Sequence, residues 1–200
     1  MFNKNPETDK QGNTYISEIY SEIRRPVTSY PLHLAKEILK RNKLEKKLNL
    51  LEVGCGRGDL LKAFNSLGHS VEGADLSSES QKILKPIKVH HQNLEYEKIN
   101  NREEYYDIIV SKSLIEHLRS PLKFVKNCKD LLKKDGVFVL MTPSWYHHEF
   151  GPFYLDFTHV TPFTLQSLRD LGLLAGFKDV KVGDNLVIGN NNIEEIFTIK

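Results

Sequence analysis

Residues 50–61 read LLEVGCGRGDLL: an apolar run, three alternating glycines and a second apolar pair. The glycines are Gly54, Gly56 and Gly58. Glycine lets a backbone bend sharply and approach a ligand closely, and here it stands between a strand-like and a helix-like segment. The helix that follows would present free backbone amides to an anionic group. The stretch therefore predicts a ligand-binding turn between a buried strand and a helix.

The rest of the chain alternates apolar runs typical of buried strands with amphipathic segments typical of helices. We expect helices over 31–48, 59–68, 77–85, 121–136 and 162–176. We expect strands over 48–53, 70–75, 87–91, 105–111, 137–142, 177–184 and 194–200.

Strands separated by helices indicate an α/β fold, a doubly wound and mostly parallel sheet with helices on both faces. No helix separates the last two of the seven expected strands, so a terminal strand is expected to be antiparallel. Ligands in such sheets bind beyond the carboxyl ends of the strands, where the strand order reverses. The glycine turn should lie there.

Composition limits the class of protein. Two hundred residues, 40% of them hydrophobic, suit one globular domain over residues 1–200. A net charge of +2 lacks the excess of basic residues that nucleic-acid-binding domains carry. We find no apolar stretch of membrane-spanning length and no signal peptide, and only two cysteines. These features predict a cytoplasmic protein that binds neither nucleic acid nor membrane.

Asp75 ends the strand-like segment that follows the glycine turn. A carboxylate at this point can accept hydrogen bonds from the hydroxyls of a ribose. The turn has the spacing Gly-x-Gly-x-Gly, whereas a dinucleotide-binding turn has Gly-x-Gly-x-x-Gly. The spacing therefore argues against a nicotinamide-dependent oxidoreductase.

Several stretches, in order, resemble the class I S-adenosylmethionine-dependent methyltransferases. They are LEVGCGRG (51–58), VEGADLS (71–77), QNLE (92–95), YDIIVSKSLIEHL (106–118), LLKKDGVFVLMTPS (131–144) and DFTHVTPFTLQSLRDLGLLAGF (156–177). The resemblance covers roughly residues 30 to 200 and is closest to the smaller bacterial-type enzymes. It implies a Rossmann-like methyltransferase fold and S-adenosylmethionine as the cofactor.

The resemblance also implies the residues that contact the cofactor. They are Gly54, Cys55, Gly56, Gly58, Asp75, Leu76, Asn93, Leu94 and Ser111. The glycines would surround the methionine part, with Cys55 as a small filler of the turn. Asp75 would bind the ribose, Leu76 would lie against the adenine, and Asn93 with its neighbour would flank the adenine edge. Ser111 would lie near the methionine end.

Residues 145–160, WYHHEFGPFYLDFTHV, follow the fifth strand and should lie over the cofactor. Aromatic side chains with a few polar groups are typical of a small-molecule pocket. We interpret His159 and His148 as candidate catalytic bases, since histidine needs little pKa adjustment to act near neutral pH. Two alternatives remain open: a loop braced by Asp156 and His159, or a metal site.

No metal-ligand spacing is recognisable in this segment, so we expect no bound metal. Glu116 and His117 follow the fourth strand, and a role in packing and capping is expected for them. Residues 1–30 form a candidate lid, in which Arg24 and Arg25 would grip an anionic acceptor or remain surface charges.

These features predict an S-adenosylmethionine-dependent methyltransferase that acts on a small molecule. The expected acceptor is a hydroxyl, on a sugar or a nucleotide-linked sugar. The alternatives are an N- or C-methyltransferase of another metabolite and a cofactor-binding protein without catalysis. A homodimer is left open.

Overall fold

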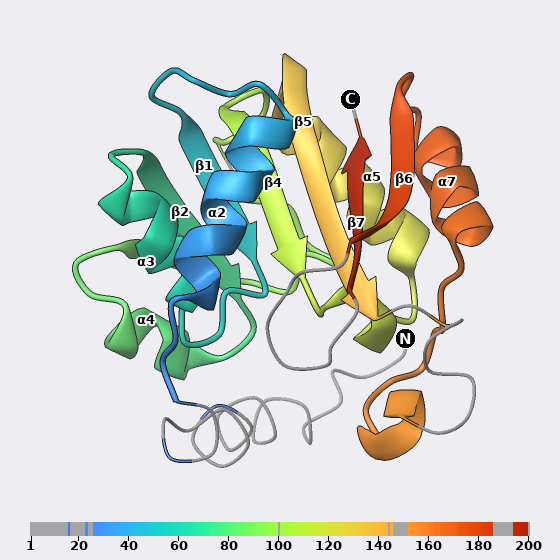
Figure 1. Ribbon diagram of the computed structural model, residues 1–200, viewed down its shortest axis with the longest axis horizontal. Helices are drawn as coiled ribbons and strands as arrows, with labels where there is room; N and C mark the ends of the chain where they lie inside the picture. Colours follow the sequence, from blue (N-terminus) through green and yellow to red (C-terminus); the bar gives the residue numbers. More distant parts are fainter. Residues whose placement is uncertain are drawn as a thin grey trace.

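A computed structural model describes residues 16, 23, 26–99, 101–143, 145, 152–185 and 194–199 (Figure 1). The strands are β1 (Asn49–Val53), β2 (Ser70–Asp75), β3 (Lys88–His91), β4 (Tyr106–Lys112), β5 (Leu132–Pro143), β6 (Val180–Asn185) and β7 (Glu194–Ile199). The helices are α2 (Tyr30–Arg41), α3 (Asp59–Ser66), α4 (Ser78–Ile83), α5 (Pro121–Leu131) and α7 (Leu165–Leu174), with short 3-10 turns η1 (Ile115–His117) and η2 (Pro152–Leu155). The candidate lid, residues 1–30, lies almost entirely outside the described residues.

The strands form one sheet in the order β3-β2-β1-β4-β5-β7-β6. The first five strands in this order are parallel, and β7 runs antiparallel to both β5 and β6. The predicted α/β class with a Rossmann-like sheet is confirmed. The strand order reverses between β1 and β4, so the functional edge is expected at their carboxyl ends.

The hydrophobic core lies on both faces of the sheet. On one face, Leu50 and Ile108 pack with residues of α2 and α3 and with Leu84, which follows α4. On the other face, Leu51 and Ile109 pack with residues of α5 and α7. Neighbouring residues of one strand point to opposite faces, so apolar runs such as that of β1 are buried on both sides. In Figure 1, α2 crosses in front of the sheet while α5 lies behind it.

Several helix ends lie where the sequence indicates them. Gly68 follows α3 with a φ of 89°, a left-handed conformation that favours glycine. The hydroxyl of Ser77 accepts the amide of Glu79 and caps α4, as predicted. A capping box between Thr164 and Ser167 starts α7.

The predicted helix over 121–136 is wrong at its end, because α5 stops at Leu131 and residues 132–136 belong to β5. Leu132 is buried and pairs with Tyr106 of β4, and the pairing resumes only at Val137. The intervening residues bulge opposite Asp107, whose carboxylate binds Lys133 at 3.0 Å. Sheet pairing and this ion pair override the helical appearance of the sequence. The predicted helix over 31–48 likewise ends early, at Arg41.

Two loops meet at the carboxyl edge of the sheet. Val53, the last residue of β1, pairs with Ser111 near the end of β4. The glycine turn that follows β1 therefore lies beside the segment that follows β4. Contact between them is close, because a Cβ built on Gly54 would lie 3.1 Å from a side-chain atom of Leu114. This edge carries the candidate site.

Candidate functional site

The glycine loop, residues 54–58, depends on left-handed backbone conformations. Gly54, Gly56 and Gly58 have φ values of 74°, 48° and 74°. Other residues rarely adopt such angles, so the alternating glycines are needed for the backbone path itself. The amide of Gly54 donates to the carbonyl of Ala74 at 2.8 Å and fixes the start of the loop against β2.

The surroundings of the glycines differ. A Cβ on Gly58 would lie 2.2 Å from Leu84 Cδ2, so this position also lacks space for a side chain. A Cβ on Gly56 would have nothing within 4 Å. The backbone at Gly56 is therefore open to a ligand, while that at Gly58 is packed against the protein.

Asp75 ties the loop to the end of β2. Its Oδ2 accepts the amide of Gly56 at 2.7 Å, and its Oδ1 accepts the amide of Ser77 at 2.7 Å. Burial raises the pKa of Asp75, and these two hydrogen bonds oppose that rise. Each carboxylate oxygen can accept a further hydrogen bond. The side chain can thus hold the loop and still bind hydroxyl groups.

Glu52 lies beneath the glycine loop in β1. Its side chain is buried, and the backbone amide of Leu61 in the first turn of α3 donates to it. Burial raises the pKa of Glu52 to about 8, although the nearby charge of Lys112 opposes the rise. A buried acid is therefore held next to the start of the helix.

The other predicted cofactor residues lie around the same edge but differ in exposure. Leu76 is 38% exposed directly after β2. Asn93 uses its side-chain oxygen to accept the amide of Glu95 at 3.0 Å, which stabilises the turn after β3. Leu94 is buried in the core and Cys55 packs under the loop against Gly73. The turn filler role of Cys55 agrees with this packing.

Ser111 is fully buried near the end of β4, next to the last residue of β1. Its hydroxyl has no hydrogen-bond partner among the residues that the structure describes. Buried hydroxyl groups are nearly always bonded, so an unpaired oxygen at this edge of the sheet is unusual.

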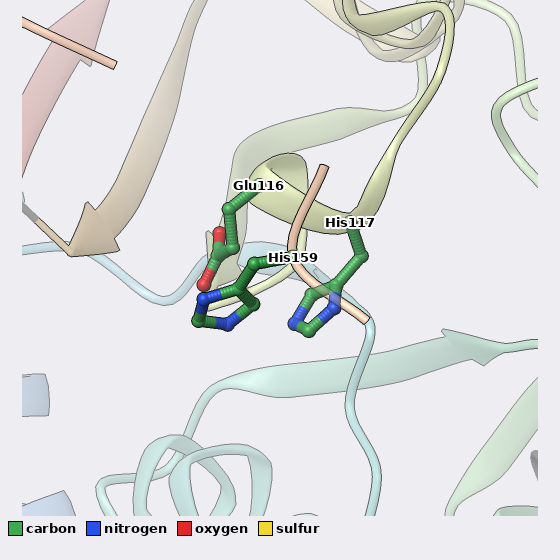
Figure 2. Close-up of side chains that lie close together, drawn as sticks. All are labelled: Glu116, His117 and His159. Carbon is green, nitrogen blue, oxygen red and sulfur yellow. The ribbon is translucent and has the colours of Figure 1, made fainter. Parts of the chain in front are cut away.

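A second group of polar side chains gathers at the ends of β4 and β5. Glu116 and His117 come from η1, and His159 comes from the loop before α7. One carboxylate or imidazole atom of each residue lies within 4.8 Å of those of the other two. Figure 2 shows the carboxylate and the two imidazole rings turned toward one place. We call these three residues the EHH cluster.

The hydrogen bonds of the two rings define their protonation. His159 Nδ1 lies 2.7 Å from the carbonyl oxygen of Phe153, an acceptor only, so Nδ1 carries the proton. His117 Nδ1 lies 2.9 Å from Thr158 Oγ1, and that hydroxyl donates its own proton to Asp156 Oδ1 at 2.5 Å. His117 Nδ1 must then be the donor to Thr158. In its neutral form, each ring therefore keeps a lone pair on Nε2.

Burial lowers the pKa of His117, and the neighbouring charge of His159 lowers it further. The ring centroids of His117 and His159 are 4.6 Å apart, and that of Phe153 is 4.6 Å from His159. Trp145 contacts Phe153 edge to face at 6.0 Å. The EHH cluster thus has a neutral histidine and an aromatic wall beside it.

Main-chain and side-chain bonds hold the EHH cluster in place. The backbone oxygen of Glu116 accepts the amides of Val160 at 2.8 Å and Thr161 at 3.0 Å. The carboxylate of Glu116 accepts the hydroxyl of Thr142 in β5 at 2.9 Å. The loop that carries His159 is therefore fastened directly to η1.

The structure brings His159 to the predicted edge but gives it partners that sequence reasoning missed. Packing and capping were expected of Glu116 and His117, whereas both side chains face the same place as His159. His148 lies outside the described residues, as do His147 and Glu149. The sequence signal for this pair is weak, because Glu116 and His117 stand four and five residues beyond the end of β4.

A family model described as "Methyltransferase domain" matches residues 22–182. This chain belongs to that methyltransferase-domain family. The expected superfamily is thereby confirmed for most of the domain, including the glycine loop and the EHH cluster.

Named relatives and solved structures agree with this assignment. The methyltransferase domain is 33% identical over 129 residues to "Ubiquinone biosynthesis O-methyltransferase" from Haemophilus ducreyi, covering 56% of this chain and 54% of that protein. The chain spans about half the length of the curated relatives it matches.

Two solved structures share the fold. A SAM-dependent methyltransferase from Archaeoglobus fulgidus has a TM-score of 0.69 at 20% identity, covering 91% of this chain and 98% of the other. The 1,6-didemethyltoxoflavin-N1-methyltransferase from Burkholderia thailandensis, solved with bound S-adenosylhomocysteine, has a TM-score of 0.68 at 18% identity, covering 100% of this chain and 91% of the other.

Among the described residues, we find no helix with the length and apolar character that crossing a membrane requires.

Proposed function

We propose that this domain binds S-adenosylmethionine along the glycine loop and methylates a hydroxyl group of a small molecule. The loop carries the proposal. Its open backbone at Gly56 and the carboxylate of Asp75 stand side by side at the point where the strand order reverses. Family membership and the names of the relatives agree with it.

The residues present fit the cofactor. Asp75 keeps acceptor capacity for ribose hydroxyls, and exposed Leu76 offers an apolar surface for the adenine. The unpaired hydroxyl of Ser111 and the open backbone at Gly56 suit the polar methionine end. Asn93 holds the turn that would border the adenine. Buried Leu94 would support this turn from the core.

Bound S-adenosylmethionine supplies a methyl group already activated on a sulfonium. The protein then has to hold an acceptor oxygen in line with that methyl group and deal with the hydroxyl proton. Orientation of this kind is worth up to about 7–11 kcal/mol. A base within reach of the acceptor adds typically about 10²–10⁴-fold to the rate.

The EHH cluster is the part of the edge suited to the acceptor. It lies next to the glycine loop through the contact of Leu114 with Gly54, and it carries two unprotonated ring nitrogens. The base role predicted for His159 is compatible with its Nδ1 bond to Phe153, because Nε2, which lies 4.0 Å from Asp156 Oδ2, can then accept a proton.

A hydroxyl on an aromatic ring is the acceptor that we favour. Phe153 beside His159 is buried, and half-buried Trp145 and exposed Tyr154, which pack against it, supply ring surfaces against which a flat acceptor can pack. The similar protein from Haemophilus ducreyi is named for O-methyl transfer in ubiquinone biosynthesis, which fits a hydroxyl acceptor. The sugar acceptor expected from the sequence finds no support in the names of the relatives compared.

Calorimetry with purified protein tests the cofactor: S-adenosylhomocysteine should bind and NAD should not. Tight NAD binding without a response to S-adenosylhomocysteine would sink the proposal. The acceptor is tested by incubating the protein with S-adenosylmethionine and hydroxylated aromatic compounds, with nucleotide-linked sugars as the comparison set. Formation of S-adenosylhomocysteine is the readout, and turnover with sugars alone would overturn the aromatic acceptor.

A further inference from the structure

We propose that the EHH cluster binds one divalent metal ion of the first transition row. The inference rests on the proposed function, since the ion would lie where the acceptor hydroxyl is expected. Its three residues come from two segments far apart in the sequence, and the fold turns their side chains to one place (Figure 2).

The separations suit a metal centre. Candidate ligand atoms of Glu116, His117 and His159 lie within 4.8 Å of one another. Metal–nitrogen and metal–oxygen bonds of about 2.0–2.2 Å place ligands within roughly 4 Å of each other. The observed limit of 4.8 Å is close to this spacing.

The second nitrogen of each ring makes the bond that metal-binding histidines usually make. Histidine ligands almost always donate the other N–H to a carboxylate, a backbone carbonyl or water. His159 Nδ1 donates to the carbonyl of Phe153. His117 Nδ1 donates to Thr158, which in turn donates to the carboxylate of Asp156. In both rings, Nε2 is therefore the nitrogen that can coordinate a metal ion.

The carboxylate is prepared in the same way. Glu116 is completely buried, and Thr142 Oγ1 donates to its Oε2 at 2.9 Å. A buried negative charge is costly, and a cation beside it offsets that cost.

Two nitrogens and one carboxylate select the kind of ion. Imidazole suits zinc, iron and other first-row ions, whereas calcium and magnesium prefer sites made of oxygen. Three protein ligands leave coordination positions open, which is the pattern of catalytic rather than structural zinc sites. The open positions would accept the oxygen of a substrate.

An ion at this place changes the role expected for His159 from base to ligand. A hydroxyl oxygen bound to the ion becomes more acidic, and its proton passes to water. That oxygen keeps the electron pair and bonds to the methyl carbon while the sulfur–carbon bond breaks. Methylated acceptor, S-adenosylhomocysteine and the released proton are the products.

Metal binding is measured first without cofactor or acceptor, on untagged protein freed of metal by a chelator. Titration with manganese chloride, followed by the electron paramagnetic resonance of free Mn²⁺, should show one site, and zinc should displace the manganese. Calcium should not compete. Loss of the signal change in His117→Ala and His159→Ala is expected, with at least tenfold weaker binding.

His33→Ala is the matched control. His33 on α2 also places Nδ1 on a backbone carbonyl, that of Ser29 at 2.8 Å, but it lies outside the EHH cluster. This variant should bind manganese like the wild type. Thr142→Val removes only the donor to Glu116 and should weaken manganese binding roughly 10–100-fold without removing a ligand.

S-adenosylhomocysteine binding by every variant shows that it is folded. Wild-type protein that binds S-adenosylhomocysteine but no manganese, zinc or cobalt overturns the metal site and leaves the proposed function intact. Equal manganese affinity in His159→Ala and the wild type also overturns it. Manganese binding without any binding of S-adenosylhomocysteine supports the metal site and contradicts the proposed function.

Discussion

The glycine loop and the EHH cluster lie at the same edge of the sheet, yet they are built in different ways. The loop is one continuous stretch whose geometry depends on backbone angles at three glycines. The cluster joins η1 to a loop far along the chain, and its geometry depends on hydrogen bonds that its side chains make to other side chains and to the backbone carbonyl of Phe153. The geometry of the loop is therefore set by local backbone angles, whereas that of the cluster is set by side-chain contacts between segments far apart in the sequence.

This difference determines what the sequence can reveal. A positive φ limits the choice of residue almost to glycine, so the requirement is visible in the sequence. Glutamate and histidine occur for many reasons, and their meeting depends on how two segments fold together. The following substitutions test whether the glycine loop depends on its backbone angles and the EHH cluster on its side-chain contacts.

The largest effect is expected from Glu52→Gln beneath the glycine loop. Folded Glu52 has a pKa of about 8, raised from the ordinary 4.5 by burial. Between these pH values the folded protein retains a proton that the unfolded chain has lost. The free energy of unfolding therefore falls as pH rises from about 4.5 to 8.

Glutamine cannot titrate, and it keeps an oxygen for the amide of Leu61. Its advantage over wild type should grow by on the order of 3–5 kcal/mol between pH 4.5 and 9. Urea unfolding across this range measures the difference. Glu72→Gln is the control, with a pH dependence of the opposite sign. Arg102 and other partners lower the pKa of Glu72 to about 2. The contribution of ionised Glu72 to the free energy of unfolding is therefore lost only as pH falls. Parallel pH profiles for wild type and Glu52→Gln would contradict a buried acid.

Next in size is the effect of Gly58→Ala. A left-handed conformation costs a residue other than glycine about 1–2 kcal/mol, and overpacking against buried Leu84 adds about 1–3 kcal/mol. Gly56→Ala meets no neighbour within 4 Å and should carry only the first cost. Thermal and urea unfolding compare the two. Equal losses would show that Leu84 moves aside freely.

Asp75→Ala comes third and is read through cofactor affinity. A hydrogen bond to a charged group is worth about 1.5–3 kcal/mol, and about 1.4 kcal/mol corresponds to tenfold in affinity. Calorimetry should therefore show S-adenosylhomocysteine binding weakened by roughly one to two decades. Asp75→Asn, which retains an oxygen for the Gly56 amide, should lose less. Unchanged affinity in a folded Asp75→Ala protein would exclude the ribose role.

The smallest effect on stability is expected from a substitution beside the EHH cluster. Thr158→Val removes the hydroxyl between His117 and Asp156 at nearly constant shape, which should cost about 1 kcal/mol of stability. Turnover should fall while S-adenosylhomocysteine affinity stays unchanged. Thr161→Val is the matched control, since its hydroxyl donates only to the carbonyl of Leu118. A change in cofactor affinity in Thr158→Val would mean that the two regions are coupled.

Much of the fold could be predicted from the sequence because its signals are local. Ser77 caps α4 as predicted, and Gly68 ends α3 in the conformation that glycine favours. The end of α5 could not be predicted, since the helical appearance of residues 132–136 gives way to pairing of Leu132 with Tyr106 across the sheet. Distant pairing carries no signal in a single stretch of sequence.

The same distinction between local and distant signals applies to the residues of the candidate site. Gly54 and its companions, with Asp75, were recognisable because they follow strands that end at one edge. His159 was singled out among aromatic residues, but its partners Glu116 and His117 were assigned to packing. The hydroxyl relay through Thr158 depends on a contact between two segments, and a sequence read in one dimension gives no sign of it.

The amides of Val160 and Thr161 that donate to the backbone oxygen of Glu116 have a consequence for sequence variation in this domain. Two of the hydrogen bonds between η1 and the His159 loop join main-chain atoms, so these two bonds do not depend on which side chains stand at 116, 117 or 159. The side chains at these three positions can therefore be changed without removing these two backbone hydrogen bonds. A library varied at these positions alone should therefore still contain folded proteins, in which the proposed acceptor preference can be compared.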